Sequence, residues 1–381
     1  MPKPNYHDGS IVNLMSSLTL GLGGAPGPYR PLLLLLPQTV AEADHLVLWV
    51  IDGLGHHYLQ RHGRLLRRYL QGSMTSVFPT STAPAITTFL TGVAPQQHGV
   101  TGWFMHLKEL GTVARILPFQ PRWGKVGLGG AVNTLLGYPV VFDRLPVRSY
   151  YIIHDSLVNS AYSAAGAGDA IRLGYRNLRG CLEVLIGALK GWRERSYVYV
   201  YWSAFDSLCH EHGVGSAAAL HHLRELEAGF VFLLQALAGS NTLLIVTADH
   251  GFIDTAPTDR THLKQHPELA TCLSMPLCGE PRAVYCHVRP GKVSRFENYV
   301  RERLGDNYEL YPSEDLIRQG WFGLGEPDPR LSERIGDYTL LPKGQHILID
   351  SLPGEKPWKQ VGVHGGLSEQ ELYVPLVVAR C

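Results

Sequence analysis

The stretch His45-Leu-Val-Leu-Trp-Val-Ile51, followed at once by Asp52-Gly-Leu-Gly55, determines how the rest of the chain is interpreted. The run is apolar from Leu46 to Ile51, has the length of a strand, and stops at a polar turn that contains glycine. A continuous apolar run, rather than an alternating one, is typical of a parallel strand that is buried on both faces. The stretch therefore predicts a central strand of an α/β sheet, with Asp52 directly after its carboxyl end.

Similar apolar runs follow along the chain, and helical patterns lie between them. Further strands are predicted over 197–202, 242–247 and 374–379, and helices over 177–193 and 216–238. Strands that alternate with helices indicate a doubly wound sheet. We therefore predict an α/β fold with a doubly wound, mostly parallel sheet and helices on both faces.

Length and composition bound the organisation of this fold. The chain has 381 residues, of which 45% are apolar, so it can bury a large core. Residues 252–360 interrupt the strand–helix pattern and contain a Gly- and Pro-rich region, so they are predicted to form an inserted cap subdomain. The core would then comprise 46–251 and 361–381, after an N-terminal arm over 1–45. A second insertion is expected over 103–159.

Charge and cysteine content disfavour several classes of protein. The formal net charge of +1 does not point to a nucleic acid polymer or a membrane surface as a partner. No apolar run reaches the roughly 18 residues of a membrane helix, since the run 32–36 ends at Pro37. No basic-then-apolar signal segment precedes that run, and the six cysteines are expected to be reduced. We therefore expect a cytoplasmic protein, whose oligomeric state the sequence does not indicate.

Side chains suited to metal binding follow three of the predicted strands. Asp52, Asp206 and the pair Asp249-His250 come after strand ends. Because the carboxyl ends of parallel strands meet at one rim of the sheet, these side chains should lie close together. His210 follows Asp206 by four residues, so both would face the same way on a helix. Mixed Asp and His ligands predict a divalent metal site, with zinc favoured and manganese as the alternative.

Thr82 and His364 complete this set of residues. His364 begins the motif His-Gly-Gly, in which small neighbours leave room for a ligand beside the backbone. Residues 76–78 are predicted to form a short strand and 84–91 a helix, which places Thr82 at the helix N-terminus. Unpaired backbone N–H groups there favour an anion such as phosphate or an alkoxide. Thr82 could also serve only as the helix N-cap, and both interpretations stay open at this point.

Taken together, the motifs resemble the alkaline phosphatase superfamily, and most closely its type I nucleotide pyrophosphatase/phosphodiesterase branch. The motifs, in order, are Asp52-Gly53, Phe78-Pro-Thr-Ser-Thr-Ala-Pro84, Thr91-Gly92, His98-Gly99, Asp206-x3-His210, Ala248-Asp-His-Gly251 and His364-Gly-Gly366. They span the core from about residue 46 to the C-terminus, and the insertions contribute nothing to the match.

The resemblance implies a two-metal phosphoryl-ester hydrolase, most closely a phosphodiesterase or nucleotide pyrophosphatase. It implies one ion held by Asp52, Asp249, His250 and the Thr82 oxygen, and a second held by Asp206, His210 and His364. Thr82 matches the family's nucleophile, which stands two residues before a proline, as Thr82 does before Pro84. The implied reaction passes through a phospho-threonine intermediate, because metal coordination activates a hydroxyl that is otherwise a weak nucleophile.

Two positions depart from the family's pattern. Ser81 stands where members usually have Lys, and Trp103 where they usually have an Asn that contacts a phosphoryl oxygen. Thr101 or a backbone N–H could supply the missing donor, so Ser81, Thr101 and Trp103 are the candidate substrate contacts. A phosphomonoesterase or phosphonate hydrolase acting on a small metabolite is the first alternative, and a non-catalytic metal-binding protein is the second. The expected partner is a small phosphate ester, with a nucleotide among the candidates.

Overall fold

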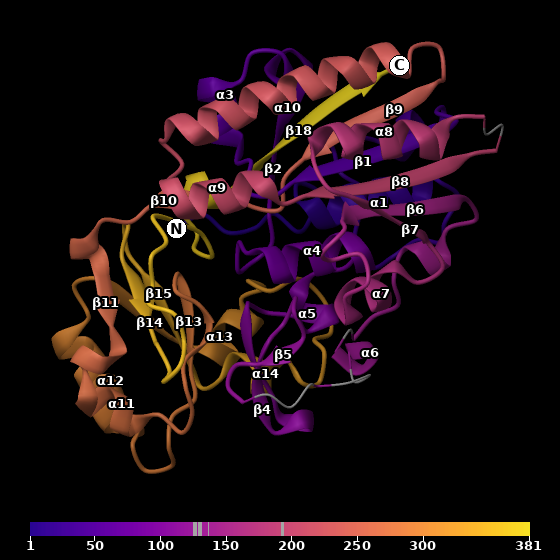
Figure 1. The fold of residues 1–381 in the computed structure, drawn as a ribbon. Helices are drawn as coiled ribbons and strands as arrows, with labels where there is room; N and C mark the ends of the chain where they lie inside the picture. The colour runs from indigo at the N-terminus through magenta and orange to yellow at the C-terminus, as the bar shows by residue number, and fades with distance from the viewer. Residues whose placement is uncertain (125–127, 129–131, 136, 192–193) are drawn as a thin grey trace.

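A central sheet of seven strands organises the larger part of the molecule (Figure 1). The computed structural model describes residues 1–124, 128, 132–135, 137–191 and 194–381. The strands of this sheet, in spatial order, are β2 (Leu70–Thr75), β18 (Tyr373–Arg380), β9 (Thr242–Thr247), β1 (His45–Ile51), β8 (Ser196–Trp202), β6 (Arg148–His154) and β7 (Ile171–Tyr175).

Most of this sheet is parallel. β1 pairs in parallel with both β8 and β9, and β6 pairs in parallel with β8 and β7. β18 alone runs against its neighbours β9 and β2. β1, β8 and β9 are buried along their whole length, as continuous apolar runs require when helices cover both faces of a sheet. The predicted mostly parallel α/β sheet is confirmed, and each predicted bound of these strands and of β18 agrees with the structure to within one residue.

Helices cover both faces of the sheet (Figure 1). On one face α8 (Leu178–Leu189) packs against α10 (Ala217–Ala236). On the other face α4 (Thr82–Thr91) contacts α1 (Ile11–Gly21) and α7 (Ala161–Ala167). The predicted helices 177–193 and 216–238 correspond to α8 and α10, although α8 ends at Leu189 and the predicted end at 193 lies outside the described residues.

The N-terminal arm contributes a helix to the core itself. α1 is buried at nearly every position, including polar residues such as Asn13 and Ser17. Their side chains bond the backbone of the following segment: Asn13 Nδ2 donates to the Arg30 carbonyl, and Ser17 Oγ accepts from Leu32 N–H. A helix that is covered on all sides needs no apolar stripe, so α1 carries buried polar side chains among its apolar ones.

The edge of the sheet differs from the prediction near residue 76. β2 ends at Thr75, so the short strand predicted over 76–78 is wrong. Ser76 N–H donates to the Leu372 carbonyl, just before β18 begins. The chain therefore leaves the sheet here and runs toward α4, which requires it to abandon the regular pairing of a strand.

A second sheet forms most of the remaining structure, in the lower part of Figure 1. Its strands, in spatial order, are β14 (Tyr308–Pro312), β15 (Tyr338–Pro342), β13 (Ala283–Cys286), β12 (Cys278–Glu280), β3 (Phe104–Leu107), β4 (Thr112–Arg115) and β5 (Gln120–Pro121). β3 to β5 come from the insertion over 103–159 and the others from 252–360, so the two insertions share one sheet. The division into arm, core and cap stays a prediction.

Short elements complete the fold. The other α-helices are α2 (Pro37–Ala41), α3 (His56–His62), α5 (Pro95–His98), α6 (Val132–Leu135), α9 (Ala204–His212), α11 (Pro267–Cys272), α12 (Val293–Arg303), α13 (Ser313–Arg318), α14 (Leu331–Ile335) and α15 (Glu369–Leu372). Two strand pairs are β10 (Ile253–Asp254) with β17 (Gly362–Val363), and β11 (Arg260–His262) with β16 (Ile347–Ile349). No helix in the described part of the chain combines the length and apolar character that a membrane span requires.

Candidate metal centre

The predicted metal ligands gather at the carboxyl ends of three adjacent strands. Asp52 follows β1, and Asp249 and His250 follow β9. Asp206 and His210 lie on α9, which begins just after β8 ends. Because β9, β1 and β8 are parallel neighbours, their carboxyl ends share one rim, as the sequence pattern predicted.

Asp52, Asp249 and His250 form the first cluster of potential ligand atoms. His250 Nε2 lies 3.2 Å from Asp52 Oδ1, 3.6 Å from Asp249 Oδ2 and 3.1 Å from Thr82 Oγ1. Ligand atoms about 2.0–2.1 Å from a tetrahedral zinc ion lie about 3.3–3.4 Å apart. The three distances therefore match the spacing that a single ion would impose.

Asp206, His210 and His364 form the second cluster. His210 Nε2 lies 3.3 Å from both Asp206 Oδ1 and His364 Nε2, and His364 Nε2 lies 3.7 Å from Asp206 Oδ1. The four-residue spacing on α9 places Asp206 and His210 on one side of the helix, as predicted. The His250 and His364 rings stack with centroids 3.7 Å apart, so the two clusters adjoin. Since Asp206, His250 and His364 also lie within ligand spacing of one another, the division of ligands between two ions stays a prediction.

Three buried carboxylate oxygens in these clusters have no hydrogen-bond partner in the described part of the chain: Asp52 Oδ1, Asp206 Oδ1 and Asp249 Oδ2. Other oxygens of the same groups are bonded, since the Tyr201 hydroxyl donates to Asp52 Oδ2 and Gly53 N–H donates to Asp249 Oδ1 at 3.0 Å. A buried carboxylate oxygen without a partner costs free energy. Cations in the two clusters would satisfy all three oxygens, so the residues present fit a pair of divalent ions.

The three histidines each present Nε2 to the clusters. Their Nδ1 atoms instead face backbone carbonyl oxygens, at 2.8 Å for His210 and Gly362, 3.0 Å for His250 and Gly251, and 3.2 Å for His364 and Thr80. A carbonyl oxygen accepts only from an N–H, so these contacts favour the tautomer that is protonated at Nδ1. That tautomer leaves Nε2 free to bind a metal ion.

Burial raises the free energy of the ionised carboxylates in the two clusters. Desolvation is the largest cause: it raises the pKa of Asp206 to about 7 and that of Asp249 to about 8, and it raises the pKa of Asp52 well above its ordinary value. Repulsion between Asp52 and its acidic neighbours adds to this effect. Desolvation also lowers the pKa of His210 to about 4, so this imidazole is neutral. Bound cations would supply the positive charge that these carboxylates lack.

Removal of divalent ions should therefore destabilise the folded protein. A ligand that binds only the folded state stabilises it by about 4 kcal/mol at a thousandfold excess over its Kd. We expect a chelator to lower Tm by several degrees and added Zn²⁺ to restore it, as measured by scanning calorimetry alongside metal analysis. An unchanged Tm in protein that has demonstrably lost its ions would show that the clusters are not stabilised by metal.

Thr82 is the first residue of α4, and Ser81 occupies the cap position. No side chain caps this helix end, so Thr82 does not act as the N-cap. Its hydroxyl faces His250 instead, at the 3.1 Å given above. This arrangement favours the interpretation of Thr82 as a nucleophile beside the first cluster.

A cavity of about 840 Å³ opens beside Thr82. Its lining includes Thr82, Asp206, His210 and His364, together with the predicted substrate contacts Ser81 and Trp103. Apart from Val363, the remaining lining residues come from the two insertions. The cavity is large enough for a nucleotide-sized ligand.

Thr101 lies outside this cavity, so its prediction as a substrate contact is not supported by its position. Its side chain is fully buried, and its hydroxyl has no partner among the described residues. The Tyr285 hydroxyl donates to the Thr101 carbonyl at 2.9 Å, which holds this residue against the second sheet. Whether Thr101 lies in the cavity depends on the path of the chain after Gly99, and the local sequence does not determine that path.

Glu280 is a candidate functional residue that the sequence did not indicate. It ends β12, is almost fully buried, and lines the cavity. Its Oε1 accepts from the Ser81 hydroxyl and, at 2.7 Å, from Trp103 N–H. Glu280 thus connects the two positions that depart from the family's pattern. Burial raises the pKa of Glu280 to about 7.

The glycine after His364 makes room for Glu280. Gly365 has φ +116°, which disfavours other residues, and a Cβ placed there would lie 2.8 Å from Glu280 Cβ. The second sheet could not approach His364 so closely if this residue carried a side chain. This agrees with the expectation that the His-Gly-Gly motif keeps space beside the backbone.

Comparison with known proteins places these residues in a wider group. A model of the family described as type I phosphodiesterase / nucleotide pyrophosphatase matches residues 46–124 and 163–367. Ectonucleotide pyrophosphatase/phosphodiesterase family member 3 is 24% identical to the chain in Mus musculus and 25% in Rattus norvegicus, over 239 residues. Each match covers 55% of this chain and 25% of the relative, so the chain spans about a quarter of the length of these relatives.

Solved structures share the fold. Murine ectonucleotide pyrophosphatase/phosphodiesterase 5 superposes with a TM-score of 0.65 at 15% identity, over 87% of both chains. An inactive threonine-to-alanine variant of the same murine protein, in complex with AMP, superposes with a TM-score of 0.64 at 16% identity. These likenesses confirm the predicted alkaline-phosphatase-like α/β fold.

Proposed function

Because the chain belongs to the type I phosphodiesterase/nucleotide pyrophosphatase family, we propose that it is a two-metal hydrolase of phosphodiester or nucleotide pyrophosphate bonds, with Thr82 as its nucleophile. The family match includes Thr82 and every predicted metal ligand. The observation that carries the proposal is the set of three unpaired carboxylate oxygens gathered with histidine Nε2 atoms beside the Thr82 hydroxyl.

The proposed ions are zinc, with manganese as the alternative, because mixed Asp and His shells suit both. One ion would be held by Asp52, Asp249, His250 and Thr82, and the other by Asp206, His210 and His364. When bound, such ions stabilise charge on phosphoryl oxygens and lower the pKa of a coordinated hydroxyl.

The proposed reaction has two steps, the first carried out by Thr82 and the second by water. The Thr82 oxygen attacks phosphorus, the bond from phosphorus to the leaving oxygen breaks, and the phosphoryl group stays on Thr82. Water then attacks the same phosphorus and releases the Thr82 oxygen. Thr82 stands at the start of the ten-residue helix α4, whose N-terminal N–H groups favour the negative charge of the phosphoryl group. The solved AMP complex of the murine relative, an inactive threonine-to-alanine variant, supports both the threonine and a nucleotide substrate.

Glu280 favours diesters over monoesters. Near neutral pH a phosphodiester carries one negative charge on its reacting group, whereas a monoester carries between one and two. Glu280 places a carboxylate beside Ser81, the residue before the nucleophile, where it repels additional charge. We therefore propose a diesterase rather than a monoesterase.

Glu280→Gln should raise the rate on monoesters relative to diesters. At about pH 8.5 the Glu280 carboxyl, with a pKa of about 7, is ionised, while Gln keeps an oxygen for Ser81 and Trp103. We expect the ratio of kcat/KM for nitrophenyl phosphate to that for bis(nitrophenyl) phosphate to rise about tenfold, or about 1.4 kcal/mol. Glu333→Gln, which removes an exposed carboxylate paired with Lys108, is the control. An unchanged ratio in Glu280→Gln would remove Glu280 as the source of selectivity.

The proposed function is tested with zinc-loaded protein and a panel of phosphate compounds. The panel comprises a nitrophenyl monoester, a nitrophenyl diester, a nitrophenyl ester of a nucleoside monophosphate, and phosphonoacetate. We expect the diesters, and above all the nucleotide ester, to give the highest kcat/KM. Highest activity on the monoester or the phosphonate would favour those alternatives, and inertness on the whole panel would favour a non-catalytic metal-binding protein.

We also propose a cytoplasmic location, as the sequence predicts. All six cysteines are free thiols, which suits a reducing compartment. Recovery of the protein from the soluble cytoplasmic fraction would support this proposal, and recovery outside that compartment would overturn it.

A further inference from the structure

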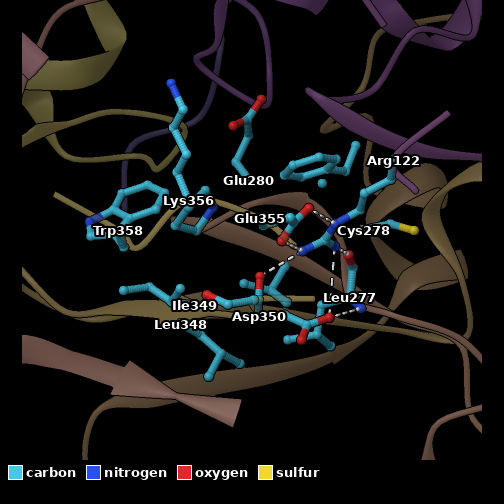
Figure 2. A pocket seen from close by; sticks show the side chains of 15 residues that line it. Arg122, Leu277, Cys278, Glu280, Leu348, Ile349, Asp350, Glu355, Lys356 and Trp358 are labelled. Atoms are coloured by element: carbon cyan, nitrogen blue, oxygen red, sulfur yellow. Dashed lines mark hydrogen bonds and ion pairs between the residues drawn. The ribbon is translucent and has the colours of Figure 1, made fainter. Parts of the chain in front are cut away.

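Arg282 connects the insertion over 252–360 to the C-terminal part of the chain. It lies in the turn between β12 and β13, two residues after Glu280, and is almost fully buried. Glu280 and Pro281, just before it, line a small cavity of about 170 Å³, shown in Figure 2. Arg282 Nη1 donates to the His346 carbonyl at 2.7 Å, which fixes the arginine within its own insertion.

The guanidinium of Arg282 forms a bidentate ion pair with Glu371 on α15. Its Nε donates to Glu371 Oε1 at 3.1 Å, and its Nη2 donates to Oε2 at 2.8 Å. The two side chains are only 2% and 0% exposed. Parallel hydrogen bonds of this kind fix the orientation of a guanidinium as well as its distance. The turn after Glu280 is therefore attached at one defined place on α15.

Glu371 contacts the backbone beside two of the predicted metal ligands. Its Oε1 accepts from Gly366 N–H at 2.8 Å, two residues after His364. Its backbone carbonyl accepts from Gly251 N–H at 2.8 Å, directly after His250. One residue of α15 thus contacts the loops that carry a histidine of each cluster.

The loop that begins at His364 is also held by Thr80. The Thr80 hydroxyl accepts from Gly365 N–H at 3.2 Å and donates to the Gly366 carbonyl at 2.6 Å. The Thr80 carbonyl faces His364 Nδ1. Gly366 N–H still needs an acceptor, and the Glu371 carboxylate provides it. The direction in which His364 presents its Nε2 therefore depends on Glu371 as well as on Thr80.

The two glycines of the His-Gly-Gly motif leave space for this ion pair. A Cβ at Gly366 would lie 2.9 Å from Arg282 Nη2 and 3.0 Å from Glu371 Oε1. A Cβ at Gly365 would lie 3.4 Å from Arg282 Cβ, in addition to its close approach to Glu280. The motif therefore allows Arg282 to reach the loop that carries a metal ligand.

Glu371 differs from the ligand carboxylates because the protein supplies its counter-charge. Burial by itself raises the pKa of Glu371, but the charge of Arg282 and several hydrogen bonds outweigh burial and hold the pKa below its ordinary value. For Asp206 and Asp249, burial instead leaves the pKa raised. Loss of Arg282 alone would leave the Glu371 carboxylate buried without a cation, and the loop beside it would have to rearrange.

We propose that Arg282 and Glu371 are positioning residues, whose ion pair holds His364 in the orientation that binds the second ion. This inference rests on the proposed function, which assigns that ion to Asp206, His210 and His364. The insertion that carries Arg282 would then contribute to metal binding although it supplies none of the predicted ligands.

The test replaces the pair with apolar side chains of similar size, in the variant Arg282→Met/Glu371→Leu. Chelator-competition titrations measure the Kd of each zinc ion, and His364→Gln, which lacks the ligand itself, identifies the second ion. We expect the Kd of the second ion to rise about tenfold, as when a group that orients a metal ligand is lost. The first ion should bind within about twofold, because Glu371 contacts the His250 loop through its backbone, which the variant keeps.

Fold stability is measured on the same proteins without ions. Arg282→Met alone leaves a buried carboxylate without its cation, whereas the double variant removes both charges, so the double variant should have the higher ion-free Tm. The Kd of the second ion should nevertheless stay raised in the double variant. A Kd that returned to the wild-type value together with Tm would mean that the pair acts only through stability, and it would overturn the proposal.

A matched control removes a second Arg–Glu pair with a buried guanidinium. Arg122 Nε donates to Glu355 Oε1 at 3.0 Å and its Nη2 donates to Oε2 at 3.3 Å (Figure 2). Arg122 also donates to the carbonyls of Leu277 and Asp350, so this pair joins the two insertions to each other. Arg122→Met/Glu355→Leu should leave both zinc Kd values within about twofold. An equal rise in the control would contradict a specific effect on the His364 loop.

The same titrations separate this inference from the proposed function. If the wild-type protein hydrolyses diesters with two ions but its zinc affinity does not depend on Arg282 and Glu371, only the positioning role is wrong. If the dependence is found and no ester is hydrolysed, the proposed function is wrong and the positioning role stands. Fewer than two ions in the wild-type protein would contradict both.

Discussion

Thr82→Ala should abolish turnover while leaving the fold and the metal content intact. The substitution removes the hydroxyl that faces His250 and leaves no replacement at the first residue of α4. Loss of a nucleophile removes the step on which the reaction depends, so we expect kcat to fall by at least about 10³-fold. Alanine is accepted within a helix, and Asp52, Asp249 and His250 remain to hold the adjacent ion. Rates on the preferred diester and metal analysis of the same sample measure both effects.

Thr82→Ser is the matched control for this prediction. It keeps a hydroxyl at the same place and should retain activity well above that of Thr82→Ala. If Thr82→Ala keeps most of its activity with both ions bound, Thr82 is not the nucleophile.

His210→Gln should remove one of the two bound ions. His210 Nε2 is within ligand spacing of both other members of its cluster, and its Nδ1 is already committed to Gly362. Since a catalytic metal ion contributes several kcal/mol of transition-state stabilisation, kcat/KM should fall by at least about 10²-fold. Metal analysis should give about one ion per chain in place of two.

His212→Gln provides the control on the same helix. Its side chain is 44% exposed, its one ion-pair partner among the described residues is Glu211 at 3.9 Å, and it belongs to neither cluster. The variant should keep two ions and normal activity. Equal losses in the two variants would mean that α9 tolerates no substitution rather than that His210 binds metal.

The core of the fold was predictable because it depends on local signals. β1, β8 and β9 are continuous apolar runs that end at polar turns, and such runs are buried in any α/β sheet. Parallel pairing then brings Asp52 and Asp249 to one rim without further assumptions. Thus a single structural rule connected the strand pattern to the candidate metal centre.

The substrate side of the site was not predictable in the same way. Glu280 lies in a long insertion, and its distance from Thr82 depends on how β12 pairs with β3 of the other insertion. That pairing is non-local and leaves no periodic signal. The position of Thr101 depends on the same kind of non-local contact, since its carbonyl accepts from Tyr285 on β13 of the insertion over 252–360.

The stereochemical course at phosphorus tests the central proposal, a covalent reaction through Thr82, most directly. A diester made chiral at phosphorus with sulfur and oxygen isotopes is hydrolysed by zinc-loaded protein, and the configuration of the product is determined. Two successive in-line displacements, the first by Thr82 and the second by water, predict net retention. Net inversion would mean that water attacks the substrate directly, and it would contradict the assignment of Thr82 as the nucleophile.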